Sequence, residues 1–294
     1  MGHLEEKTVI VTGAARGLGR AYAESAAAEG AHVVLTDVLE RVEETADEVR
    51  RSHAQPGREV SAHVGTVTDP GFCDSLVEAT EQRYGRVDAL INNAGLYLEG
   101  RFWDLDPAQV ERLVTVNVLG AMFMGRAVGA SMVKRGAGAI LNISSGASFG
   151  YPMVSAYSAS KGAVASMTYS WALDALDRGI RVNAMSPVAN TAMTATTEFQ
   201  SKVVSDAPEP SAMAPLATYL ISDAAAGITG QFFRFNGRDL HVVAHPGVKE
   251  PVVTRDSWTF DVLAEVIDGR LSRSLERIGV WQAVPPRLAE ATEV

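Results

Sequence analysis

The stretch Thr8-Val-Ile-Val-Thr-Gly-Ala-Ala-Arg-Gly-Leu-Gly19 joins a β-branched strand, a glycine-rich turn and the start of a helix. Its first five residues form an unbroken run without polar alternation, which is typical of a strand covered on both faces. Gly13, Gly17 and Gly19 follow, and an alanine-rich helix is predicted from Arg20 to Glu29. Glycines in such a turn let backbone N–H groups approach a pyrophosphate at the helix N-terminus. The stretch therefore predicts a dinucleotide-binding turn.

Strand and helix patterns alternate along the rest of the chain. The predicted strands are His32–Asp37, Val60–Val64, Val87–Ile91, Ala139–Ile143, Ile180–Met185 and Gln231–Phe235. The predicted helices are Glu40–His53, Pro70–Tyr84, Pro107–Arg135, Ser155–Asp177 and Ala214–Ser222. Such alternation implies right-handed βαβ crossovers and a parallel, doubly wound sheet. We expect an α/β Rossmann fold of about seven strands.

No run within this alternating region has the composition of a linker, so residues 1–294 are interpreted as one Rossmann-type domain with its core at 7–237. Residues 192–213 are polar and contain prolines, which favours a lid over the substrate. Residues 238–294 form a C-terminal extension with a different pattern. It contains two predicted extended stretches and one predicted helix, at Leu240–Ala244, Pro251–Thr254 and Thr259–Ile267. We expect the extension to pack across a neighbouring subunit or to close the substrate pocket.

Composition excludes several classes of partner. The chain has 294 residues, 47% of them hydrophobic, a net charge of −9 and a pI near 5.2, which argues against nucleic acid or an acidic membrane surface. A single cysteine, Cys73, excludes an internal disulfide and fits a reducing compartment. No signal-peptide pattern precedes the first strand, and Asn117 and Arg126 interrupt the longest apolar stretch. We expect a soluble, cytoplasmic protein.

Tyr157 and Lys161 lie four positions apart in a predicted helix and therefore share one face. A phenol titrates near ~10, so a tyrosine that acts as an acid or base at neutral pH needs a nearby cation to stabilise its anion. Lys161 is placed to provide that charge. The pair is common on ordinary helices, but the upstream glycine turn makes a catalytic interpretation specific.

Asp37 ends the second predicted strand, 24 positions beyond Gly13. A carboxylate there can accept hydrogen bonds from an adenosine ribose and would repel a 2′-phosphate, which favours NAD over NADP. Arg16 argues the other way, because a guanidinium in the turn can pair with a phosphate. Asp37 as a solvated acid at a strand end is the alternative.

Taken together, the motifs resemble those of the short-chain dehydrogenase/reductase family over about residues 7–237. The matching pieces are Thr12-Gly-Ala-Ala-Arg-Gly-Leu-Gly19, Asn92-Asn-Ala-Gly95, Asn117, Asn142-Ile-Ser-Ser145, Tyr157-Ser-Ala-Ser-Lys161 and Arg181-Val-Asn-Ala-Met-Ser-Pro187. Their order along one chain makes a chance match very improbable. The resemblance implies hydride transfer between a nicotinamide cofactor and a secondary alcohol or ketone.

The resemblance implies a catalytic set of Asn117, Ser145, Tyr157 and Lys161. Tyr157 would exchange a proton with the substrate oxygen, the serine would hold that oxygen, Lys161 would lower the tyrosine pKa and bind the nicotinamide ribose, and Asn117 would hold a relay water. The implied cofactor contacts are Gly13, Arg16, Gly17, Leu18, Gly19, Asp37, Thr66, Val67, Asn93, Ala94, Gly95, Tyr157, Lys161, Pro187 and Thr191.

Two serines compete for the catalytic position. Aligning the strand Asn142-Ile-Ser-Ser145 on the family pattern selects Ser145, whereas counting back from Tyr157 selects Ser144. Strand register determines which side chains face the site, and a loop absorbs a deletion more easily than a strand does. We therefore choose Ser145 and keep Ser144 as the alternative.

The substrate side is less determined. Pro187-Val-Ala-Asn-Thr191, which lacks the usual glycine, resembles the branch that contains the (3R)-hydroxyacyl-CoA dehydrogenases, and this activity is the alternative function. A non-catalytic dinucleotide sensor is an alternative from another class. Candidate pocket residues are Met193, Phe199, Val203 and Val204 in the lid, and Tyr97, Trp103, Tyr151 and Met153 elsewhere.

Two further expectations concern assembly and metals. The family resemblance implies a homotetramer or homodimer formed through the two long helices. His241 and His245 repeat at four in a strand-like segment without a third ligand, so we expect no metal site.

Overall fold

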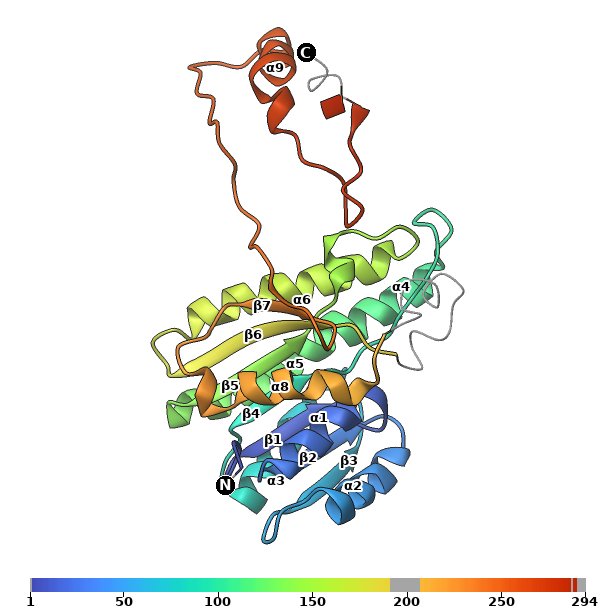
Figure 1. Ribbon diagram of the computed structural model, residues 1–294, viewed down its shortest axis with the longest axis vertical. Coiled ribbons are helices and arrows are strands. Elements are labelled where there is room, and N and C mark those ends of the chain that lie inside the picture. The colour runs from blue at the N-terminus through green and yellow to red at the C-terminus, as the bar shows by residue number, and fades with distance from the viewer. Residues whose placement is uncertain (1, 191–206, 287, 290–294) are drawn as a thin grey trace.

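The computed structural model describes residues 2–190, 207–286 and 288–289. Its sheet has eight strands in the order β3-β2-β1-β4-β5-β6-β7-β8 (Figure 1). The strands are β1 Thr8–Thr12, β2 His32–Asp37, β3 Val60–Val64, β4 Ala89–Asn92, β5 Gly138–Ile143, β6 Ile180–Pro187, β7 Phe232–Phe235 and β8 Leu240–Val242. The first seven pair in parallel, and β8 runs antiparallel to β7. The predicted doubly wound parallel sheet is confirmed, with one added edge strand.

Helices cover both faces of the sheet (Figure 1). They are α1 Gly17–Ala28, α2 Arg41–Ser52, α3 Pro70–Tyr84, α4 Pro107–Val114, α5 Ala121–Arg135, α6 Ser155–Asp174, α8 Ala214–Ile221 and α9 Phe260–Val266. Side chains from α1, α2 and α8 pack on one face of the sheet, and those from α3, α5 and α6 pack on the other. Because successive strand residues point to opposite faces, a strand covered on both faces needs apolar side chains at successive positions, as the fully buried β1 (Thr8-Val-Ile-Val-Thr12) shows.

Several predicted boundaries are wrong. The helix expected over Pro107–Arg135 contains a π-helical segment at Thr115–Gly120, where Asn117 bonds to a neighbouring main chain instead of facing solvent. Helix α6 ends at Asp174, three residues early, because the chain turns there toward Gly179, whose φ is +69°. Pro251–Thr254 forms no paired strand.

Among the described helices, the continuous α4–α5 unit is long and apolar enough, by length and composition, to cross a membrane. Its most apolar window is 44% buried within the fold. Arg126 on this unit forms an ion pair with Asp74 of α3, and Asn117 accepts a hydrogen bond from Leu96 N, so the unit is integrated in the α/β layers.

After β8 the chain leaves the sheet as an extended segment, forms α9, and turns back toward the body (Figure 1). We call residues 243–289 the C-terminal tail. It is attached to the body where Val243 N–H donates to Phe232 O and where His245 packs on Tyr169 with ring centroids 4.0 Å apart. The predicted short helix at Thr259–Ile267 is observed as α9 with a π-helical continuation.

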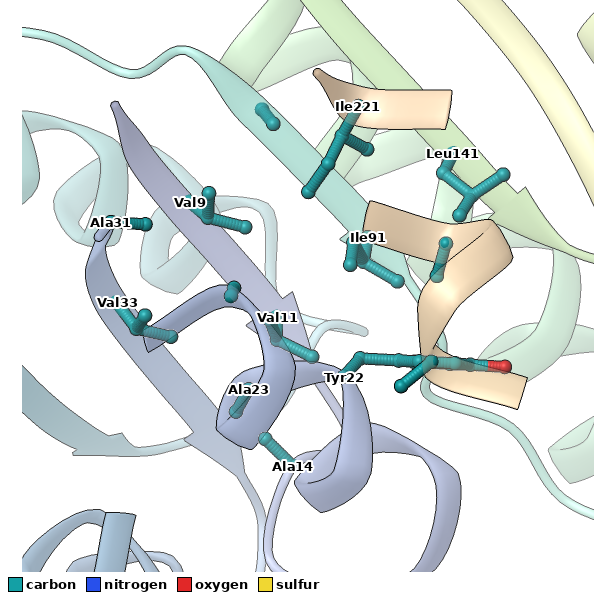
Figure 2. Close-up of a cluster of buried hydrophobic side chains, with 14 of the residues drawn as sticks. Val9, Val11, Ala14, Tyr22, Ala23, Ala31, Val33, Ile91, Leu141 and Ile221 are labelled. Carbon is teal, nitrogen blue, oxygen red and sulfur yellow. The ribbon is translucent and has the colours of Figure 1, made fainter. Parts of the chain in front are cut away.

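Tyr22 is the largest side chain in the core between α1 and α8, and it is fully buried. Figure 2 shows its ring reaching from α1 toward the ribbon that carries Ile221. Within the described residues its hydroxyl has no hydrogen-bond partner, and burial raises its pKa. The ring therefore stabilises this core through apolar contact, and its oxygen contributes a desolvation cost.

We expect Tyr22→Phe to leave the free energy of unfolding unchanged or to raise it, because it removes an unpaired buried polar atom. Tyr22→Ala should lower it by about 3–5 kcal/mol through the cavity that it leaves. Urea unfolding of the two variants measures both values. A loss above about 1 kcal/mol in Tyr22→Phe would show that the hydroxyl has a partner.

Candidate active site

The predicted site residues gather at the carboxyl ends of β1, β4, β5 and β6. The strand order reverses between β1 and β4, and this reversal opens a crevice at the sheet edge. The glycine turn after β1 lies on one side of that point, and the start of α6 lies on the other.

The three glycines of the turn are suited to their positions for different structural reasons. A Cβ at Gly13, whose φ is +65°, would lie 2.8 Å from Ala94 Cα, and one at Gly19 would lie 2.2 Å from Gly13 O. Gly17 has a φ of +60°, and a Cβ there would meet open space. Gly13 and Gly19 therefore allow close packing, while Gly17 borders an open cradle.

The start of α1 borders the same cradle. Its N-cap, Arg16, makes no side-chain capping bond, and the first turn carries no acidic residue. Backbone N–H groups at such a terminus are suited to an anion, which a pyrophosphate supplies. Leu18, half-buried, packs on the core beneath the turn. The residues present thus fit a dinucleotide.

Asp37 is anchored beside the turn. Its Oδ2 accepts from Ala15 N at 3.0 Å and its Oδ1 accepts from Leu39 N at 3.0 Å. A carboxylate offers about four lone-pair sites, so each oxygen keeps one for a further donor such as a hydroxyl. The bonds hold the negative charge at the end of β2, next to the first turn.

Asn93 supports the turn. Its Nδ2 donates to Thr12 O at 3.0 Å and to Gly13 O at 3.1 Å. The Thr12 hydroxyl accepts from both Asn93 N and Ala94 N at 3.0 Å. Thr12 was missed as a site residue from the sequence; its only signal was a polar side chain at the end of an apolar strand. These bonds tie β1 to β4 at the crevice.

The remaining predicted cofactor residues are distributed along the same edge. Thr66 Oγ1, after β3, shares a 2.8 Å hydrogen bond with Thr68 Oγ1, and Val67 is buried against Gly120. Gly95 is close to Lys161, because a Cβ added at Gly95 would lie 3.5 Å from Lys161 Nζ. Pro187 ends β6, whereas Thr191 lies outside the described residues.

Tyr157 lies in the first turn of α6 and is 9% exposed. Burial raises its pKa to about 12, and a hydrogen bond with Ser145 acts in the opposite direction. Ser145 Oγ also accepts from Ala147 N at 3.1 Å. In contrast, Ser144 Oγ donates to Lys161 O at 2.8 Å, so the structure brings Ser145 and not Ser144 to the phenol.

Lys161 is one turn further along α6 and is 5% exposed. Its Nζ donates to Ile143 O at 2.7 Å and lies 5.8 Å from the centroid of the Tyr157 ring. Burial lowers the pKa of Lys161 to about 8. We expected Lys161 to depress the tyrosine pKa; burial is the largest influence on that pKa and acts against the expected shift.

Asn117 is 1% exposed and lies in the π-helical segment. Its Nδ2 donates to Leu96 O at 2.9 Å and to Ser160 Oγ at 3.0 Å, and its Oδ1 accepts from Leu96 N at 2.7 Å. Both amide protons are therefore used, and one Oδ1 lone pair remains for a relay water. Ser160, a second residue missed from the sequence, fixes this amide.

An apolar cluster surrounds Tyr157 on the side away from the glycine turn. Tyr97 meets the Tyr157 ring edge-on with centroids 5.1 Å apart, and Tyr151 packs in the same cluster. Trp103 instead pairs with Phe102 and is 62% exposed. The lid candidates Met193, Phe199, Val203 and Val204 lie outside the described residues.

Within the described part of the chain, no cluster of three metal-ligating side chains exists. His245 packs on Tyr169, and His241 is exposed on β8. Cys73 is buried, and burial raises its pKa to about 11, which disfavours the reactive thiolate.

Comparison with known proteins gives a consistent assignment. The family model for short chain dehydrogenases matches residues 7–202. The 3-oxoacyl-[acyl-carrier-protein] reductase FabG of Thermotoga maritima is 33% identical over 243 residues, 80% of this chain and 98% of the relative.

Two solved structures extend the likeness to the fold. A short chain dehydrogenase from Mycobacterium avium has a TM-score of 0.79 and 29% identity, covering 97% of this chain and 98% of that one. NAD⁺-bound xylitol dehydrogenase has a TM-score of 0.73 and 28% identity, and the match covers 80% of this chain and 99% of that one. The resemblance that the motifs indicated is confirmed: the chain belongs to the short-chain dehydrogenase family and is an oxidoreductase that acts on CH–OH groups.

Proposed function

We propose that the protein is an NAD-dependent oxidoreductase that interconverts a secondary alcohol and a ketone, with Tyr157 as its acid/base. The observation that carries this proposal is the hydrogen bond between Ser145 and Tyr157, whose buried ring lies next to the buried Lys161 at the sheet edge that the glycine turn also borders. No step of the reaction requires a group that this arrangement lacks, apart from the cofactor itself.

In alcohol oxidation, the Tyr157 oxygen accepts the hydroxyl proton of the substrate while Ser145 Oγ hydrogen-bonds the same substrate oxygen. Bound NAD⁺ supplies the hydride acceptor and, through its positive ring, part of the charge that stabilises a phenolate. One pKa unit corresponds to about 1.4 kcal/mol, so moving the Tyr157 pKa from about 12 to neutrality requires about 7 kcal/mol.

Lys161 supplies part of the charge that stabilises the Tyr157 phenolate. With a pKa of about 8, its ammonium is largely protonated at neutral pH. One of its protons is donated to Ile143 O, and the others remain for the nicotinamide ribose or the phenolate. Asn117 acts as a positioning residue by holding the Leu96 main chain, and its free Oδ1 lone pair is the acceptor for a relay water.

NAD is the proposed cofactor because the Asp37 carboxylate is held at the end of β2 by Ala15 and Leu39 main-chain donors. Its negative charge would face the 2′-phosphate of NADP. The similar xylitol dehydrogenase was solved with NAD⁺, which supports the same choice.

The substrate class has two candidates. Similarity to xylitol dehydrogenase favours simple secondary alcohols, and similarity to the 3-oxoacyl reductase FabG favours a (3R)-3-hydroxyacyl-CoA or 3-oxoacyl substrate. The aromatic cluster beside Tyr157 presents Tyr97 and Tyr151, which suit an apolar substituent on the carbinol carbon. A non-catalytic dinucleotide sensor would not need the Ser145–Tyr157 pair.

We also propose a cytoplasmic homotetramer or homodimer. The long helices expose large apolar side chains: Val114, Leu119 and Met122 around the π-helical segment, Val133 near the end of α5, and Leu173 on α6. Such exposed apolar residues on two neighbouring helices suit a second copy of the chain. The same pairing explains why α4–α5 is as apolar as a membrane-spanning helix.

The activity is tested by NADH production across secondary alcohols and 3-hydroxyacyl-CoAs. We expect Tyr157→Phe to reduce turnover by about 10²–10⁴-fold and to retain NADH binding, whereas Tyr169→Phe on the same helix stays near wild type. The rate of alcohol oxidation should rise with pH as Tyr157 loses its proton, and should fall above about pH 8, where deprotonation of Lys161 removes the positive charge that stabilises the phenolate. A pH-independent rate, or an active Tyr157→Phe, contradicts the assignment.

We expect Asp37→Asn to lower the ratio of kcat/KM with NAD⁺ to kcat/KM with NADP⁺ by at least about tenfold, a change of about 1.4 kcal/mol. The matched control is Glu40→Gln, which removes an exposed carboxylate close by in the sequence and should change the ratio much less. Steady-state kinetics with both cofactors measure the ratio. A wild-type preference for NADP⁺ would exclude the role of Asp37 in selecting NAD⁺.

Leu173→Glu should dissociate the assembly, because Leu173 is 74% exposed on α6 and a charge there opposes burial against a second copy. Val248→Glu in the C-terminal tail, at a fully exposed position, should leave the assembly intact. Sedimentation velocity distinguishes the species. An unchanged mass for Leu173→Glu excludes this face as the interface.

A further inference from the structure

The returning part of the C-terminal tail forms a small hairpin. Ile278 and Ala283 exchange two main-chain hydrogen bonds, of 2.7 and 3.1 Å, and Gln282 N donates to Gly279 O at 3.1 Å. We call residues 278–283 the C-terminal hairpin. Gly279 and Gln282, the first and last residues of this turn, both have a positive φ, of 61° and 52°.

The C-terminal hairpin contacts the main chain of the body at Gly150. Val280 N–H donates to Gly150 O at 3.0 Å. A Cβ at Gly279 would lie 2.6 Å from the same carbonyl oxygen, so the approach excludes a side chain there. Figure 1 shows the tail returning toward the body after α9.

Gly150 belongs to the segment that joins β5 to α6, residues 145–154. This segment begins with Ser145 and continues through Tyr151, which packs in the cluster around Tyr157. One segment therefore carries both the serine that hydrogen-bonds Tyr157, at its start, and part of the apolar wall, further along. We call it the catalytic loop.

The catalytic loop is strained. Gly150 has a φ of +88°, and Met153, which has a side chain, has a φ of +67°. Such conformations cost about 1–3 kcal/mol each for non-glycine residues and persist only where neighbouring groups hold them. Gly100 N donates to Met153 O at 2.6 Å on one side, and Val280 N donates to Gly150 O on the other.

The inner side of the catalytic loop is held independently. The Arg234 guanidinium donates a hydrogen bond to Ser186 and lies against Gly146. A Cβ added at Gly146 would lie 1.9 Å from Arg234 Nη1, so there is no space for a side chain at that position. Phe149 packs near Phe232 with centroids 5.9 Å apart. The start of the catalytic loop is therefore fixed from within the body, while the Gly150 end depends on the C-terminal hairpin.

We propose that the C-terminal hairpin is a specificity-determining part of the substrate site, with Gly279 as its positioning residue. By holding Gly150, it fixes the Tyr151 side of the pocket and sets the affinity for the substrate. Ser145 and the cofactor crevice are held by other contacts, so they are insensitive to it. This inference rests on the proposed function, because its kinetic test needs a turned-over substrate. Its structural test, hydrogen exchange of backbone amides, does not depend on that function.

The test uses the full-length chain with Gly279→Ala, which forces the hairpin away from Gly150. Gly269→Ala is the matched control, because the same substitution in the same tail meets nothing within 4 Å. Val280→Pro is a second variant, since it removes the donor to Gly150 O without adding bulk at Gly279. For each we measure substrate KM and kcat, the NADH dissociation constant by fluorescence, and hydrogen exchange over residues 146–153.

We expect Gly279→Ala and Val280→Pro to raise the substrate KM about tenfold, equivalent to about 1.4 kcal/mol, with kcat within about threefold and NADH affinity unchanged. Amide exchange over residues 146–153 should speed up in both and stay at the wild-type rate in Gly269→Ala. Wild-type exchange in both variants would overturn the contact with the catalytic loop. Faster exchange with an unchanged KM would overturn the specificity role.

The two proposals fail in different ways. A wild-type protein that binds NADH but turns over no substrate in the panel contradicts the proposed function, while the exchange experiment still decides whether the C-terminal hairpin holds the catalytic loop. A loss of NADH binding in Gly279→Ala but not in Gly269→Ala would contradict the separation between the substrate side and the cofactor crevice.

Discussion

The structure depends on the junction where β1 and β4 meet. Asn93 donates two hydrogen bonds to Thr12 across it, from its N–H to Thr12 Oγ1 and from its Nδ2 to Thr12 O, and Gly13 packs there against Ala94 without room for a side chain. The junction sets the glycine turn on one side and Gly95, beside Lys161 and Asn117, on the other. A crevice at a reversal of strand order follows from parallel topology, and these bonds join the two strands between which the order reverses.

Burial has opposite consequences for the two central groups of the site. It raises the pKa of Tyr157 to about 12 and lowers that of Lys161 to about 8, so it shifts both groups toward their neutral forms, and the Lys161 ammonium still remains largely protonated at neutral pH. Catalysis needs the charged phenolate at the moment of proton transfer. The hydrogen bond from Ser145 acts against burial, and the low polarity that penalises the charge also strengthens this hydrogen bond.

Much of the fold and of the site followed from the sequence. Strand and helix order, the glycine turn and the Tyr157–Lys161 spacing are local patterns, and local patterns carry over directly into backbone geometry. Register also favoured Ser145 over Ser144, and the structure places Ser145 at the phenol. The π-helical segment at Thr115–Gly120 was missed, because it results from the bonds of Asn117 with Leu96 and Ser160, which are distant in sequence.

By itself, then, the sequence determined the α/β class, the family and the residues that meet at the sheet edge, because strand periodicity and short motifs are properties of neighbouring residues. Only the tertiary structure decided how those residues are held: the Thr12–Asn93 tie, the net influence of burial on the Tyr157 pKa, and the return of the tail to Gly150. Each of these is a contact between segments far apart in the chain, and no local pattern encodes its geometry.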